Sequence, residues 1–176
     1  AVLAGQAYPD TDENLRKYLD SFFTGSERIS DEKSRQRVSA LIAPHIDLRA
    51  GKKVYTQAYT AIKKLNPKMV VILGTGHSLH QSNFSLTEKD FETPLGLIKT
   101  EKLFVRKLRE AHRAIVAPND IDHRNEHSIE FQLVFLQYLF GSDFSLIPVL
   151  CGSVQDDLAV YSRASEIPGV SGFVEG

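Results

Sequence analysis

Residues 68–73, Lys-Met-Val-Val-Ile-Leu, restrict the fold of this chain more than any other segment. A continuous apolar run rich in β-branched side chains is typical of a strand in a parallel sheet covered on both faces. Residues 38–43, which are followed by Pro44, and residues 144–150 have the same character, so we expect two more buried strands. Pro148 cannot donate a backbone hydrogen bond, and it favours an edge or a bulge for the last of these strands.

Helical patterns alternate with these strands. The first helix begins after Asp10 or Thr11, carries an apolar stripe that includes Leu15 and Leu19, and ends at Gly25, after which polar residues to position 37 form a loop. Further helices are expected at residues 53–65, 101–112, 126–140 (with Asn125 as the cap) and 156–165, and short strands at 84–87 and 97–99. This alternation predicts an α/β fold with a central, mostly parallel or mixed sheet flanked by helices.

Length and composition exclude several classes of protein. A chain of 176 residues with 42% hydrophobic residues is long enough for one domain, residues 1–176, with a proper core. Its single cysteine excludes a disulfide framework and paired-cysteine zinc fingers. With 21 basic and 22 acidic residues, a net charge of -1 argues against nucleic acid or an acidic membrane surface as partner. We find no apolar run long enough for a membrane span and no signal peptide, and we expect a cytoplasmic protein.

Three histidines occupy positions of chemical interest. His45 follows the expected strand 38–43, and His77 follows strand 68–73. If these strands are parallel, both histidines emerge at the carboxyl edge of the sheet, where open α/β sheets bind their ligands. His127 lies in the first turn of the apolar helix, where the helix dipole disfavours the imidazolium, so a neutral ring able to bind a metal or accept a proton is expected.

Each of these signals has a plainer alternative, because a single histidine after a strand is often a loop side chain satisfied by its neighbours. Asp47 and Arg49 either orient His45 and bind an anion or form a surface ion pair. Cys151 is either a thiolate at the same edge or a buried structural residue. We include Ser78, His80 and His123 as further candidates for the pocket. Glu126, His127 and Ser128 are too close in sequence to form a Ser-His-acid triad.

Several motifs follow one another in a specific order along the chain. They are Ala4-Gly-Gln-Ala-Tyr-Pro9, Ala43-Pro-His45, Val71-Ile-Leu-Gly-Thr-Gly-His-Ser78, Thr93-Pro-Leu-Gly96, Asn125-Glu-His-Ser-Ile-Glu130 and Ile147-Pro-Val149. In this order the chain resembles the Memo family, which comprises the mediator of cell motility and the prokaryotic AmmeMemoRadiSam system protein B. The resemblance extends to about residue 155.

The resemblance implies a fold similar to that of the class III extradiol dioxygenases, with a metal at one edge of the sheet. His45 and His77 match the two metal-ligand histidines of the family, and His127 matches the histidine in the acid/base position. Iron(II) is the favoured metal, with copper or zinc as alternatives. The resemblance also implies a radical-SAM protein and an AMMECR1-like protein as partners, beside a small-molecule or peptide ligand.

Two departures from the family pattern affect this interpretation. After the proline the family usually has His-Ala-Gly-Tyr, whereas this chain has His45-Ile-Asp-Leu48. A later family segment of the Ser-Ser-Asp-Phe type supplies the remaining ligand, and we find no match to it; Cys151 lies in the wrong place. We therefore expect a truncated or partial domain that is incomplete at its C-terminus, with two histidine ligands of its own.

Three functions fit these residues. The first is a metal-binding, dioxygenase-like oxidoreductase in which His127 and Glu126 act near the metal. The second is a non-enzymatic adaptor that binds a peptide or phosphopeptide, with Arg49, Lys52 and Lys53 at the rim of the pocket. The third is a zinc-dependent hydrolase, for which Glu126 or Asp47 is the only candidate general base.

Overall fold

The structure is a computed structural model that describes residues 1–24 and 38–152. The helix predicted at 156–165 and the loop predicted at 25–37 lie outside these ranges. In chain order the elements are α1 (Asp12–Phe23), α2 (Lys52–Thr60), β1 (Met69–Thr75), β2 (Phe84–Leu86), β3 (Phe91–Thr93), β4 (Gly96–Thr100), α3 (Lys102–Ala111), the short 3-10 helix η2 (Ile121–His123), α4 (Ser128–Phe140) and β5 (Ser145–Cys151).

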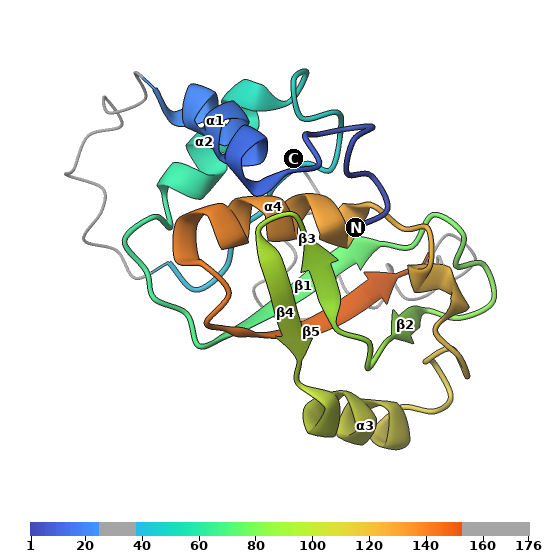
Figure 1. Cartoon of the computed structure of the whole chain (residues 1–176). Coiled ribbons are helices and arrows are strands. Elements are labelled where there is room, and N and C mark those ends of the chain that lie inside the picture. Colours follow the sequence, from blue (N-terminus) through green and yellow to red (C-terminus); the bar gives the residue numbers. More distant parts are fainter. Residues whose placement is uncertain (25–37, 153–176) are drawn as a thin grey trace, which may run out of the picture.

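The strands form one mixed sheet in the order β1-β5-β4-β3. Strand β5 pairs in parallel with β1 over the whole length of β5, and its first residues also pair in parallel with β4. The last residues of β5 pair antiparallel with β2, and β3 forms an antiparallel hairpin with β4. The helices lie on both sides of this sheet (Figure 1). The predicted α/β class with a mixed sheet flanked by helices is therefore confirmed.

Helix α4 lies between the sheet and the helices α1 and α2 (Figure 1). Other elements cover α4 on both sides, and its side chains are accordingly apolar around almost the whole circumference of the helix. Phe135 of α4 is fully buried, and its ring stacks between Tyr55 and Tyr59 of α2, with ring centroids 4.7 Å apart in both pairs. The hydroxyl of Tyr59 donates to the Gln132 side chain at 2.6 Å, so the buried phenol keeps a polar partner.

Two helices bury only part of the apolar face that their sequence pattern indicates. The expected helix 53–65 carries Val54, Ala58, Ala61, Ile62 and Leu65 on one side. Ile62 is buried, but Val54 is 51% exposed, and α2 turns Tyr55 and Tyr59 inward. The large rings bury more area than a valine side chain, which decides the orientation. In α3 the exposed side chains include Leu103 and Phe104, and only Val105 is fully buried, against Ile147 and Val149 of β5.

The strand predicted at residues 38–43 is wrong. This segment is irregular, and Ile42 is 96% exposed while Leu41 and Ala43 pack against the core. A strand requires a neighbour for its backbone hydrogen bonds, and no described strand pairs with this segment. The two short strands predicted at 84–87 and 97–99 are present as β2 and β4, and an additional strand that the sequence analysis did not predict, β3, forms the hairpin with β4.

Among the residues that the structure describes, strand β1 has one buried face and one exposed face. Ile72 is buried beneath α4, whereas Met69, Val71 and Leu73 are 48 to 69% exposed among the residues that the structure describes. The expectation that this strand is covered on both faces is thus not met. Pro148 lies in the central strand β5 rather than at an edge. On the side away from β1, however, β4 pairs only up to Leu146 and β2 only from Val149, so no strand among the described residues lies opposite Pro148 there.

None of the helices in the described part of the chain is long and apolar enough to cross a membrane.

We predict that Phe135→Ala lowers the free energy of unfolding by about 3–5 kcal/mol, because it leaves a cavity between the two tyrosine rings. The exposed Phe104 is the matched control, and Phe104→Ala should change this free energy by less than about 1 kcal/mol. Urea unfolding followed by circular dichroism measures both variants. Equal losses for the two variants would contradict the stacked arrangement.

Candidate functional site

The site forms where the N-terminus of α4 meets the carboxyl end of β1. His77 follows β1 after one residue, and His127 occupies the N-cap position of α4. The two elements approach closely at Gly74, where an added Cβ would lie 2.6 Å from Ser128 Oγ and 2.7 Å from Ile129 Cγ1. Any larger residue at position 74 would push α4 away from the sheet. The glycine thus allows the helix to approach the strand closely.

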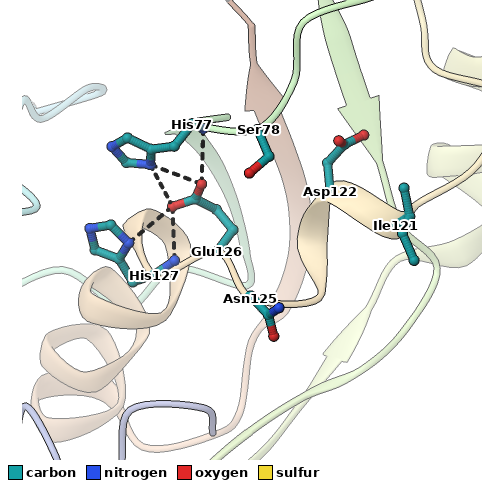
Figure 2. Close-up of a pocket in the computed structure, with 7 residues that line it drawn as sticks. All are labelled: His77, Ser78, Ile121, Asp122, Asn125, Glu126 and His127. Carbon is teal, nitrogen blue, oxygen red and sulfur yellow. Dashed lines mark hydrogen bonds and ion pairs between the residues drawn. The ribbon is translucent and has the colours of Figure 1, made fainter.

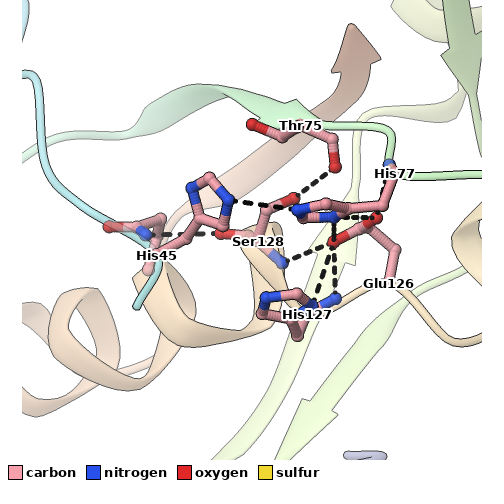
Figure 3. Close-up of polar contacts among 7 residues, drawn as sticks. His45, Thr75, His77, Glu126, His127 and Ser128 are labelled. Atoms are coloured by element: carbon pink, nitrogen blue, oxygen red, sulfur yellow. Dashed lines mark hydrogen bonds and ion pairs between the residues drawn. The ribbon is translucent and has the colours of Figure 1, made fainter. Parts of the chain in front are cut away.

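His45 reaches the same place from the segment before α2, and the three histidines form one cluster (Figure 3). The Nε2 atoms of His45 and His77 are 3.3 Å apart. One ring nitrogen from each of His45, His77 and His127 lies within 4.8 Å of the other two. The rings of His77 and His127 are nearly parallel, with centroids 4.9 Å apart. The juxtaposition expected for His45 and His77 is therefore present, although His45 does not follow a strand.

Glu126 connects the cluster to the helix start, and its side chain is only 5% exposed (Figure 2). Its carboxylate accepts hydrogen bonds from the backbone N–H groups of His77, His127 and Ser128 at 2.8 to 3.1 Å. It also lies 2.9 Å from His77 Nδ1 and 3.4 Å from His127 Nδ1. Burial alone would raise the pKa of Glu126, but these hydrogen bonds outweigh burial and lower the pKa to about 2.

The ionised Glu126 determines which ring nitrogen of His77 carries a proton. A carboxylate only accepts hydrogen bonds, so Nδ1 of His77 carries the proton that points to it. The Nε2 atom of a neutral His77 then has a free lone pair facing His45. Burial, together with the charges of His77 and His127, lowers the pKa of His45, so the neutral ring of His45 is favoured.

Glu126 also takes the place of the predicted cap. Asn125 makes no cap contact, and the Glu126 carboxylate serves the first N–H groups of the helix instead. The Ser128 hydroxyl is buried and donates to the Thr75 carbonyl at 3.0 Å (Figure 3). Ser128 is therefore part of the contact between helix and strand, which agrees with the absence of a Ser-His-acid triad.

A shallow cavity of about 270 Å³ adjoins the cluster (Figure 2). It shares His77, Glu126 and His127 with the cluster. Ser78 is the only other wall residue that the sequence predicts. The rest of the wall consists of Ile121, Asp122 and Asn125. The sequence did not predict these three as pocket residues, because their only signal was a position shortly before Glu126.

The remaining candidates lie elsewhere. Asp47 Oδ1 accepts from the backbone N–H groups of Arg49 and Ala50 at 2.9 Å, so it stabilises its own turn. Arg49 and His80 are exposed and line neither this cavity nor the second cavity of about 400 Å³. His123 lines only that second cavity.

Cys151 is half-buried at the end of β5, where burial raises the pKa of its thiol. A raised pKa disfavours the thiolate, which supports the structural alternative for this residue.

The fold and the site define an α/β protein with a histidine cluster at the carboxyl end of a sheet strand. The family model described as Memo-like protein matches residues 1–166, and the chain belongs to this family. Over 172 residues the chain is 36% identical to a MEMO1 family protein of Pyrococcus furiosus, covering 95% of this chain and 57% of that protein. A MEMO1 family protein of Aquifex aeolicus is 34% identical over 147 residues, and the match covers 84% of this chain and 37% of that protein. The chain thus spans about half the length of such relatives.

We predict that acid destabilises the metal-free protein partly through Glu126. A carboxyl group whose pKa is lowered in the folded state stabilises the fold above its unfolded pKa of about 4.5, and this contribution is lost as pH falls towards 2. Glu126→Gln should therefore be less stable than the wild type at pH 7, and the difference should shrink between pH 4.5 and 2. Urea unfolding at several pH values measures this. Glu110→Gln, which changes an exposed glutamate of α3, should keep the wild-type profile; a pH-independent loss in Glu126→Gln would contradict the account.

Proposed function

We propose that this chain carries a Memo-type metal centre of redox, dioxygenase-like character, in which His45 and His77 hold a divalent metal. Iron(II) is the favoured metal, and copper or zinc are alternatives. The observation that carries the proposal is the convergence of three imidazole nitrogens within 4.8 Å.

The donor atoms fit a metal ion. The Nε2 atoms of His45 and His77 are 3.3 Å apart, which is close enough for both nitrogens to bind one metal ion. Imidazole nitrogens are ligands for iron, copper and zinc alike.

The contact between Glu126 and His77 adds independent support. Metal-binding histidines usually donate their second ring N–H to a carboxylate or carbonyl, which orients the ring and selects the tautomer. Glu126 accepts from both the backbone and the ring of His77. In this proposal Glu126 is a positioning residue, and His127, whose side chain is 34% exposed, exchanges protons with a bound ligand. A bound metal would supply Lewis acidity or redox chemistry.

The two alternative functions receive less support from the described residues. A phosphopeptide adaptor requires cations near the pocket, but Arg49 and Lys53 line neither cavity, and the Lys52 ammonium lies over the ring of Phe22 at 5.3 Å. A zinc-dependent hydrolase requires a free general base, whereas the Glu126 carboxylate already accepts several hydrogen bonds. The reaction itself, the radical-SAM and AMMECR1-like partners and the remaining ligand of the metal stay proposals about the whole protein.

We predict that the protein binds one equivalent of iron(II) or zinc and that the double variant His45→Ala, His77→Ala loses this binding. Anaerobic equilibrium dialysis with metal analysis measures the uptake. His80→Ala is the matched control, since His80 is an exposed histidine three residues from His77 and outside the cluster. Uptake that persists in the double variant, or that is lost equally in the control, would overturn the proposed centre.

We further predict that Glu126→Gln weakens metal binding by about 10- to 100-fold without abolishing it, which is the usual effect of removing a carboxylate behind a ligand histidine. Calorimetric titration with zinc measures the affinity. Circular dichroism on the same sample separates loss of affinity from loss of fold. An unchanged affinity would mean that Glu126 stabilises only the start of α4.

A further inference from the structure

We propose that Asp122 selects the ligand of the cavity beside the histidines, and that this ligand presents an ammonium group or another strong hydrogen-bond donor rather than an anionic group. This inference rests on the proposed function, because the cavity is taken to hold the molecule on which the metal centre acts.

The cavity has two chemically different ends (Figure 2). His77 and His127 lie at the end next to the cluster, and Ile121 and Asp122 of η2 lie at the other. Ser78 lies between the two ends. A ligand that fills the cavity would therefore contact both the histidines and Asp122.

Asp122 differs from the other acidic groups in this region because, within the described part of the chain, its carboxylate interacts only electrostatically, with the neighbouring His123. Asp120, two residues earlier, accepts from the Thr87 hydroxyl at 2.6 Å and from Lys89 at 3.2 Å. The Glu126 carboxylate is occupied by backbone and ring N–H groups. Asp122 makes no hydrogen bond and no ion pair with the part of the chain that the structure describes, although it is half-buried. A partly desolvated carboxylate without a counter-ion is available to a ligand.

The charges of the wall favour the same class of ligand. No lysine or arginine is among the described residues that line the cavity. In the metal-free protein the acidic groups of the wall are Glu126 and Asp122. An anionic ligand would therefore meet Asp122 as a like charge, whereas a donor group gains a charge-assisted hydrogen bond.

Three probes of one shape and different charge test the proposal: benzylamine, benzyl alcohol and benzoate, each titrated into metal-free protein at pH 7. Backbone amide shifts of Ser78 and Asn125 report binding in the cavity. We expect saturable shifts with benzylamine, weaker ones with benzyl alcohol and none with benzoate. Asp122→Asn should weaken benzylamine binding at least tenfold, and Asp143→Asn, which changes an exposed aspartate paired with Lys68, should leave it unchanged.

Benzoate binding as tight as that of benzylamine, no effect of Asp122→Asn, or no binding by any of the three probes would each overturn the inference. Metal uptake is measured separately on the same samples. A protein that binds benzylamine through Asp122 and takes up no metal would refute the metal centre and keep the cation-selective cavity, whereas the opposite result would refute only the selection by Asp122.

Discussion

The N-terminus of α4 lies against the carboxyl end of β1 because residue 74 is a glycine, and the rest of the site depends on this contact. Ser128 and Ile129 occupy the space that a side chain at position 74 would fill. The close approach places the Glu126 carboxylate within hydrogen-bonding distance of His77, on a different element. The buried Glu126 carboxylate thereby joins the loop after β1 to the start of α4. The cluster depends on both segments, because His77 lies in the loop and His127 lies at the helix start.

Two opposing effects act on Glu126. Its burial costs free energy because the charge leaves water, and the N–H groups of two elements offset this cost. The same hydrogen bonds set the tautomer of His77 and leave its Nε2 atom facing His45. The carboxylate that starts the helix therefore also prepares the ring nitrogen for a ligand, and a substitution here is expected to affect both stability and binding.

The sequence predicted much of this arrangement and missed particular parts for physical reasons. The apolar runs that became β1 and β5 and the apolar helix α4 were found because burial leaves a strong local signal. The meeting of His45 and His77 was also predicted, although the strand assumed before His45 is absent, since strand formation depends on a partner that local sequence does not encode. The role of these histidines as metal ligands stays a prediction.

Tertiary contacts decided the features that were missed. The inward turn of Tyr55 and Tyr59 depends on the ring of Phe135, about 80 residues away along the chain. Glu126 replaced the expected cap Asn125 because its longer side chain also reaches His77. Asp122 gave no signal in the sequence, and its interest arises only from the cavity that the fold creates around it.

The state of the imidazole nitrogens during a zinc titration tests the central claim most directly, and ¹⁵N NMR of histidine-labelled protein observes these nitrogens. The account predicts that His77 carries its proton on Nδ1 before zinc is added, and that the Nε2 signals of His45 and His77 shift together as one equivalent of zinc binds. A His77 ring protonated on Nε2, or ring signals that do not respond to zinc, would contradict it.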